Sequence, residues 1–220
     1  KPASNPAAQG YPPWADLFCP KPAFPFSKKY GILSKGQARL ACQITTERFS
    51  MLDHFFGRFY PDLVIHDVTC LPVAQLKRLG IRLLFFDIDN TLAPFDQALP
   101  SPAIIRQFQT LQQEGLLLCL LSNNTPERVD RFNGPLGVLA VSRAGKPGCK
   151  KLQAVLKDQG LNARQAALVG DQVFTDMYCA HSAGMLAIYS QPLCPRDQWI
   201  TKIKRPAERI VLSCYERSRS

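Results

Sequence analysis

The feature that most constrains the fold of this chain is a repeated alternation of short apolar runs and amphipathic segments. The apolar runs predict five strands, at residues 81–87, 116–121, 138–141, 166–169 and 185–189. The segments between them predict four helices, at residues 101–114, 125–132, 147–159 and 174–181. Strands that are apolar along their length and connected through helices are typical of a parallel sheet covered on both faces. We therefore predict an α/β fold with a doubly wound parallel sheet.

The 220 residues are enough for one such domain with additional segments at its ends. Seven of the 18 prolines lie within the first 25 residues, where no helical or strand periodicity is present. We predict a flexible, Pro-rich leader over residues 1–50 and a folded domain over residues 51–220. Further helices are expected at residues 51–60 and 73–79 and, with basic character, at residues 205–215.

The excess of positive charge lies at the two ends of the sequence. Residues 1–50 contain 7 Lys/Arg and 2 acidic residues, residues 201–220 contain 6 and 2, and the remaining 150 residues contain 14 and 13. Basic ends are attracted to anionic surfaces, either phospholipid headgroups or nucleic acid, although solubility alone also explains them. An anionic surface is therefore one expected partner.

The sequence contains no pattern that is typical of a membrane span or of secretion. The longest apolar run, residues 116–121, is far shorter than the roughly 18 residues that a spanning helix needs, and no signal peptide is recognisable. The eight cysteines lack C-x-x-C spacing, which favours a reducing compartment over a disulfide framework or a zinc site. We expect a cytoplasmic protein, with peripheral association with the inner face of the membrane as a further option.

Polar and charged residues follow the predicted strands at the points where the strands end. They are Asp87 and Asp89 after the first strand, Ser122 and Asn123 after the second, Lys146 before the helix at 147–159, and Asp171 and Asp176 after the fourth strand. Each motif alone is common in turns and helix caps. In a doubly wound sheet, however, these strand ends meet at one edge, where this class of fold places its sites. The succession of motifs therefore predicts a single functional site.

The residue types at this edge suit the chemistry of phosphate esters. Asp87 is placed to bind a metal ion and attack phosphorus, Asp89 to handle the proton of the leaving group, and Ser122 and Asn123 to donate hydrogen bonds to phosphate oxygens. Two carboxylates and a phosphate repel one another, because unit charges about 4 Å apart interact by ~4 kcal/mol at an effective dielectric constant near 20. A divalent cation and Lys146 would compensate this repulsion.

The order of these motifs resembles that of the haloacid-dehalogenase (HAD) phosphatase superfamily. The matching residues are Asp87, Asp89 and Thr91 in its nucleophile motif, Ser122 in the second, Lys146 in the third, and Asp171 with Asp176 in the acidic fourth. The resemblance extends over about residues 60–215 and implies a Rossmann-like core. It also implies that Asp87 is a nucleophile that becomes an aspartyl phosphate, with Asp89 acting as general acid and then as base.

The same resemblance implies how the substrate and a cofactor are held. Ser122 and Lys146 would bind the transferring phosphoryl group. The ligands of Mg²⁺ would be the carboxylate of Asp87, the backbone carbonyl of Asp89 and the carboxylate of Asp171. Asp176 would support the water shell of the metal or Lys146, and Thr91 would be a further supporting residue.

A closer resemblance is to the YqeG subfamily of HAD class IIIA, which is similar to the mitochondrial phosphatidylglycerophosphate phosphatases of fungi and plants. The segments that carry it are FDIDNTLAP at 86–94, SNN at 122–124 with ERV at 127–129, KP at 146–147, VGDQVFTD at 169–176 and WITKI at 199–203. This similarity implies a phosphate monoester substrate, and specifically an anionic phospholipid.

The spacing of the motifs leaves no room for a cap domain over the site. Only 32 residues separate Asp89 from Ser122, and 23 separate Ser122 from Lys146. An open site accepts bulky or membrane-embedded substrates, so our leading hypothesis is a Mg²⁺-dependent phosphatase for phosphatidylglycerophosphate. One alternative is a HAD phosphatase for a phosphoprotein, a nucleic-acid end or a soluble metabolite. Another is a basic RNA- or ribosome-associated binding protein, which the intact set of catalytic charges disfavours.

Overall fold

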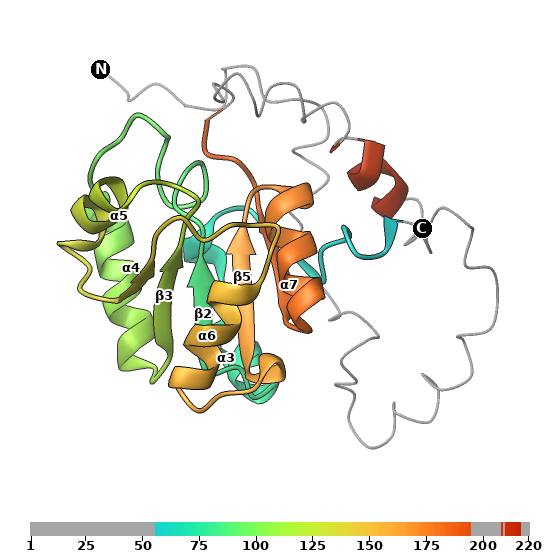
Figure 1. The fold of residues 1–220 in the computed structure, drawn as a ribbon, viewed down its shortest axis with the longest axis horizontal. Helices are drawn as coiled ribbons and strands as arrows, with labels where there is room; N and C mark the ends of the chain where they lie inside the picture. Colours follow the sequence, from blue (N-terminus) through green and yellow to red (C-terminus); the bar gives the residue numbers. More distant parts are fainter. Residues whose placement is uncertain (1–55, 195–207, 209, 217–220) are drawn as a thin grey trace, which may run out of the picture.

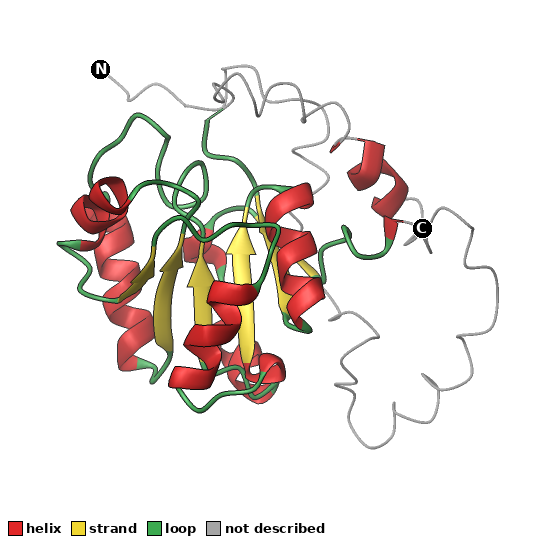
Figure 2. Ribbon diagram, viewed as in Figure 1, coloured by secondary structure: helices red, strands yellow, loops and turns green. Residues whose placement is uncertain are grey.

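The computed structural model describes residues 56–194, 208 and 210–216. Their core is a six-stranded sheet with helices on both faces (Figures 1 and 2). The strand order is β1-β6-β5-β2-β3-β4, and every neighbouring pair is parallel. The strands are β1 (Leu63–Ile65), β2 (Leu83–Phe86), β3 (Leu117–Leu121), β4 (Leu139–Val141), β5 (Ala166–Gly170) and β6 (Leu186–Ser190). The predicted α/β fold with a doubly wound parallel sheet is confirmed.

The connections between the strands are mostly helical. They comprise η4 (Val68–Cys70), α3 (Val73–Arg78), α4 (Pro102–Gln113), α5 (Pro126–Asn133), α6 (Lys150–Asp158), η5 (Ala163–Gln165), η6 (Val173–Met177) and α7 (Tyr178–Ala183). Local sequence explains where α4 begins, because the Ser101 hydroxyl accepts a hydrogen bond from the backbone N–H of Ile104 at 3.3 Å. Pro102 then occupies the first turn, where a missing N–H costs nothing.

The two faces of the sheet bury two separate hydrophobic cores. Successive residues of a strand point to opposite faces, so Leu84 and Phe86 of β2 pack beneath α3, α4 and α5. Leu83 and Phe85 of the same strand pack against α6, α7 and the terminal helical residues. All four side chains are completely buried, which explains why β2 is apolar at every position.

The edge strand β1 was not among the predicted strands. It has only three residues, two of them half-buried, and it pairs only with β6. Such a short run carries too little periodicity to be recognised in the sequence. The segment before α3 was therefore expected to be a simple connection.

Two predicted helices differ from the observed ones close to the site edge. The helix expected from residue 147 begins at Lys150, because Gly148 first closes a turn by donating a hydrogen bond to the Gly145 carbonyl at 2.8 Å. The helix expected at 174–181 is a π-helical turn, η6, followed by α7. Turns of this type occur frequently at functional sites.

The predictions for the chain ends are only partly covered by the structure. Of the helix expected at 51–60, residue 56 is helical, whereas residues 57–60 form turns and a bend, because Gly57 and Pro61 are poor helix formers. Of the helix expected at 205–215, residues 208 and 210–216 are helical. Residues 1–55, 195–207, 209 and 217–220 lie outside the described residues, and with them the predicted leader.

The order of the strands determines where a site can form. From β2 the chain proceeds outward to β3 and β4 and then returns to β5 on the other side of β2. A crevice forms at the carboxyl ends of the strands at such a switch point. The segments 90–121 and 123–145 consist of α4, β3, α5 and β4 with short loops, without an inserted domain. In the part of the chain that the structure describes, no helix is both long and apolar enough to cross a membrane.

Candidate active site

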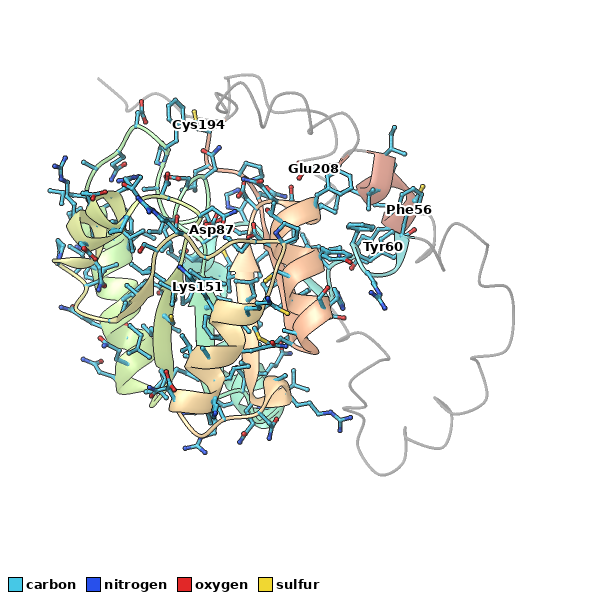
Figure 3. The ribbon with its side chains drawn as sticks, viewed as in Figure 1. Phe56, Tyr60, Asp87, Lys151, Cys194 and Glu208 are labelled. Carbon is cyan, nitrogen blue, oxygen red and sulfur yellow. The ribbon has the colours of Figure 1, made fainter. Side chains whose placement is uncertain are left out.

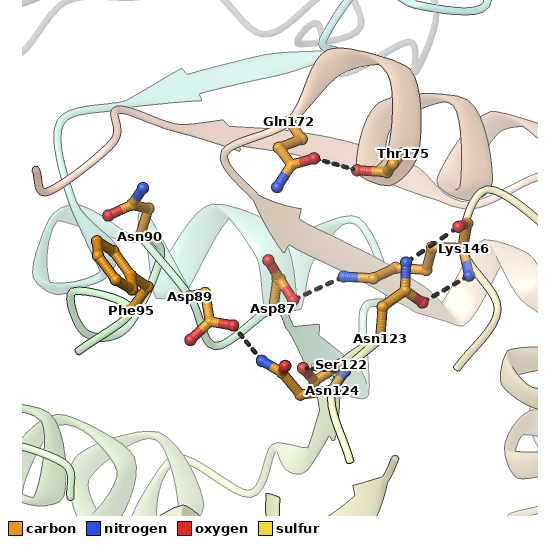
Figure 4. Close-up of a pocket in the computed structure, with 10 residues that line it drawn as sticks. All are labelled: Asp87, Asp89, Asn90, Phe95, Ser122, Asn123, Asn124, Lys146, Gln172 and Thr175. Carbon is orange, nitrogen blue, oxygen red and sulfur yellow. Dashed lines mark hydrogen bonds and ion pairs between the residues drawn. The ribbon is translucent and has the colours of Figure 1, made fainter. Parts of the chain in front are cut away.

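A polar pocket lies at the carboxyl ends of β2, β3 and β5 (Figure 4). Its volume is about 240 Å³, and its lining residues are Asp87, Asp89, Asn90, Phe95, Ser122, Asn123, Asn124, Lys146, Gln172 and Thr175. Figure 3 shows Asp87 at the end of the central strand, where the loops converge. Asp171 and Asp176 are completely buried beside this pocket. The structure thus brings together residues that the sequence analysis took from four separate motifs.

The buried ammonium group of Lys146 lies between two carboxylates. Its Nζ atom is 2.7 Å from Oδ1 of Asp87 and 2.7 Å from Oδ1 of Asp176. The Asn123 side chain fixes the backbone of the lysine, because its Oδ1 accepts from Lys146 N at 2.8 Å and its Nδ2 donates to Lys146 O at 3.0 Å. Asn123, which follows β3, therefore positions Lys146. Asp87, which follows β2, and Asp176, in η6, neutralise the charge of its ammonium group.

Burial and neighbouring charges shift the pKa values of this pair. Burial raises the pKa of Asp87 to about 7 against the lowering effect of the Lys146 ammonium, and the carboxylates of Asp176 and Asp89 add to the increase. For Lys146, burial lowers the pKa, but the carboxylates of Asp176 and Asp87 outweigh this effect and hold the pKa above its ordinary value. Lys146 therefore carries its charge, while the carboxylates around it still outnumber the cations.

Three carboxylates form a cluster of the kind that holds a divalent cation. The oxygens of Asp87, Asp171 and Asp176 lie within 4.8 Å of one another. Asp176 uses Oδ1 on Lys146, and its Oδ2 accepts from the backbone N–H of Gln172 at 3.1 Å. The Thr91 hydroxyl approaches Oδ1 of Asp171 only to 3.5 Å. Oxygen donors suit Mg²⁺, so the cluster fits this ion.

Asp89 is held by two residues that the sequence analysis did not select. Its Oδ2 accepts a hydrogen bond from Nδ2 of Asn124, and its Oδ1 lies 3.1 Å from Nη2 of Arg128. Both residues belong to segments that carry the YqeG resemblance, which was a signal of their importance. Their common partner was not visible in the sequence, because Asp89 meets them only when β2 pairs with β3.

The predicted phosphate-binding residue Ser122 is buried at the bottom of the pocket. Its hydroxyl oxygen accepts a hydrogen bond from the backbone N–H of Asn124 at 3.2 Å. This contact leaves the hydroxyl proton to be donated elsewhere. The geometry is therefore compatible with a hydrogen bond from Ser122 to a phosphate oxygen.

Gly170 was not among the predicted site residues, yet it determines the position of Asp176. A Cβ atom at Gly170 would lie 2.4 Å from Cγ of Asp176 and 2.6 Å from its Cβ. These distances are far below van der Waals contact, and Cβ of Asp176 cannot move without the backbone. Only glycine at the end of β5 allows Asp176 to reach Lys146.

Comparisons with known proteins agree with the motifs. A family model described as mitochondrial PGP phosphatase matches residues 51–194. The chain is 29% identical over 159 residues to "Probable phosphatase YqeG" of Bacillus subtilis, covering 72% of this chain and 92% of that protein. It is 24% identical over 166 residues to phosphatidylglycerophosphate phosphatase 1 of Arabidopsis thaliana, covering 71% of this chain and 47% of that protein. The chain thus spans about half the length of this plant relative.

Among solved structures, the chain is similar to a HAD phosphatase from Thermococcus onnurineus, with a TM-score of 0.44 and 14% identity. The similarity covers 58% of this chain and 98% of that one. The resemblance to HAD phosphatases of the YqeG type, which the motifs predicted, is confirmed by the family match and by the bacterial relative. This chain is therefore a phosphatase and belongs to the mitochondrial PGP phosphatase family.

Proposed function

We propose that this chain is a Mg²⁺-dependent phosphate monoester hydrolase that acts through an aspartyl phosphate and whose substrate is phosphatidylglycerophosphate. The observation that carries the proposal is the buried contact of Lys146 with Asp87 and Asp176 at the base of the pocket. A buried cation held beside a carboxylate nucleophile prepares a pocket for a doubly charged phosphoryl group. The family match and the name of the plant relative support this substrate.

In this mechanism the carboxylate of Asp87 attacks phosphorus. The bond from phosphorus to the leaving oxygen breaks, and Asp89 donates its proton to that oxygen. Asp89 then accepts a proton from the water molecule that attacks the aspartyl phosphate, which releases inorganic phosphate and restores Asp87. The hydrogen bonds from Asn124 and Arg128 support this role, because they fix the carboxylate of Asp89 at the pocket wall.

Residues that follow β3 and β4 are assigned to the phosphoryl oxygens. We assign Ser122 and Lys146 to direct contacts with these oxygens, as the resemblance implied. Asn123 fixes the backbone of Lys146 with both ends of its side-chain amide, and its predicted direct contact with phosphate stays a prediction. Together these residues would neutralise and orient the group that is transferred.

We assign the Mg²⁺ ligands to the carboxylates of Asp87 and Asp171 and to the backbone carbonyl of Asp89. When bound, this ion neutralises the negative charge that phosphoryl oxygens bring to the carboxylates. Asp176 supports the site through Lys146, and Thr91 supports it through the carboxylate of Asp171.

The pocket dimensions favour recognition of the end of a large substrate. Its volume of about 240 Å³ is below the roughly 300–1,000 Å³ of pockets that enclose a drug-sized ligand. The phosphoryl group and its neighbouring atoms would enter, while the lipid body stays at the surface. The basic ends, at 1–50 and 201–220, would attract an anionic membrane by ~1 kcal/mol for each nearby Lys or Arg. We propose peripheral membrane association on this basis, with residues 1–50 outside the phosphatase domain.

A substrate panel tests the proposal. Phosphate release is measured with phosphatidylglycerophosphate in vesicles, para-nitrophenyl phosphate, a phosphopeptide and a 5′-phosphorylated oligonucleotide. We expect kcat/KM for the lipid to exceed the other values by at least about tenfold, or about 1.4 kcal/mol. A higher kcat/KM for the phosphopeptide or the oligonucleotide would assign the pocket to that substrate and contradict the lipid proposal.

Asp87→Asn tests the nucleophile. Asparagine has nearly the same shape but is a poor nucleophile, so kcat should fall by roughly 10³-fold or more, as in other enzymes that lose their nucleophile. Circular dichroism should show that the variant is folded. Turnover above a few per cent of the unsubstituted protein, with deamidation excluded by mass spectrometry, would show that Asp87 is not the nucleophile.

Asp171→Ala tests the metal site. Loss of a ligand carboxylate should raise the Mg²⁺ concentration for half-maximal activity by at least about tenfold. Asp158→Ala, at an exposed position in α6, is the matched control and should leave this concentration unchanged. Full turnover of the unsubstituted protein in excess EDTA would exclude the assigned role of the metal.

Gly170→Ala tests whether Asp176 must reach Lys146. The added methyl group would displace Asp176, so we expect kcat to fall by roughly 10- to 100-fold, the scale for losing an outer contact of a charged site. Gly134→Ala is the control, because a Cβ there meets its nearest atoms at an ordinary 3.6 Å. Equal activity of the two variants would contradict the role of Asp176.

A further inference from the structure

Glu208, in the terminal helical segment, makes a polar contact that reaches the site. Its side chain is only 2% exposed, and its Oε1 accepts a hydrogen bond from the backbone N–H of Val173 at 3.1 Å. Carboxylates are rarely buried to this extent without a structural or functional requirement. Glu208 also lies beyond residues 51–194, to which the family model extends.

The N–H that Glu208 accepts belongs to the turn that carries the acidic fourth motif. We call residues 171–176 the acidic turn. Within it, Thr175 Oγ1 donates to Oε1 of Gln172 at 3.2 Å, and Gln172 N donates to Oδ2 of Asp176. Val173 begins η6, and the first N–H groups of a helix have no acceptor within the helix. Glu208 supplies an acceptor at this bend.

Apolar contacts hold the terminal segment in place beside α7 (Figures 1 and 3). Val211 and Leu212 are buried in the core on this face of the sheet. The Tyr215 ring lies 5.5 Å from the ring of Tyr60, measured between centroids. The cluster that contains Val211 and Leu212 also contains Val173. Apolar packing therefore holds the segment against this face, and the carboxylate of Glu208 adds a hydrogen bond to the backbone of the acidic turn.

We propose that Glu208 is a positioning residue that sets the geometry of the acidic turn. By accepting the N–H of Val173, it keeps Asp171 beside Asp87 and keeps Asp176 on Lys146. The inference rests on the proposed function of the acidic turn in binding the metal and the phosphoryl group. It predicts that a segment distant in sequence from every catalytic motif determines metal affinity and kcat.

Four variants of the full chain separate this role from simple docking. Glu208→Ala and the similarly sized Glu208→Met both remove the acceptor, whereas Glu208→Gln retains a carbonyl oxygen. Leu212→Ala weakens the docking of the same segment without changing Glu208. The melting temperature of each variant is measured first, and all assays are run well below the lowest value.

The readouts are hydrogen exchange of the peptide over residues 171–177, and turnover of para-nitrophenyl phosphate as Mg²⁺ is titrated. For Glu208→Ala and Glu208→Met we expect exchange at least about tenfold faster. We also expect half-saturating Mg²⁺ to rise about fivefold, the scale of one net hydrogen bond, with kcat reduced and KM unchanged. Glu208→Gln should stay within about twofold of the unsubstituted protein, and so should Leu212→Ala despite a lower melting temperature.

Three results would overturn the inference. Unchanged exchange in Glu208→Met would remove the link to the acidic turn. Faster exchange with unchanged Mg²⁺ requirement and kcat would make Glu208 a structural contact only. Equal losses in Glu208→Gln and Glu208→Met would show that the hydrogen-bond acceptor is not what matters. A failure of the proposed metal role is distinguishable, because the unsubstituted protein would then turn over without Mg²⁺. Hydrogen exchange and kcat of the Glu208 variants would still test the inference.

Discussion

The ammonium group of Lys146, buried between Asp87 and Asp176, must be matched by the structure around it. Figure 4 shows its contact with Asp87. A buried cation is tolerated only when its partners are close and correctly placed. Gly170 lacks the side chain that would push Asp176 away, and Asn123 fixes the backbone of the lysine. These residues come from different strands and loops, and their common purpose is the placement of one charge.

The same contact bears on the proposed metal site. Lys146 is shared by Asp87 and Asp176, and the carboxylate oxygens of Asp87, Asp171 and Asp176 still lie within 4.8 Å of one another. A phosphate ester entering the pocket would add negative charge to this cluster. The arrangement is favourable when positive charge is supplied beside Asp87 and Asp171, which is where the oxygen donors gather. The charges of the protein and those of a phosphate ester would therefore both be compensated by a cation at this position.

The fold and the central residues of the site were predictable from the sequence because their signals are local. β2 is continuously apolar, and Asp87 follows it directly, so its position at a strand end could be inferred without knowing the tertiary structure. Strand β1 was not predicted because three residues at the edge of the sheet are too few to show a hydrophobic periodicity. The π-helical turn η6 was not predicted because the Met177 N–H donates to the Gln172 carbonyl five residues earlier, and one such turn leaves no distinct period in the side chains. Nothing in the sequence indicates that Arg128 pairs with Asp89, or Glu208 with Val173, since each contact depends on long-range packing.

The parallel pairing of β2 with β5 has a consequence for how the molecule assembles. Asp87 and Asp171 are separated by more than 80 residues, and they approach each other only when these strands align in register. Contacts between residues so distant in sequence form slowly, because a long loop must close first. The charge density of the site therefore depends on long-range strand pairing, and no local segment of the chain carries it alone.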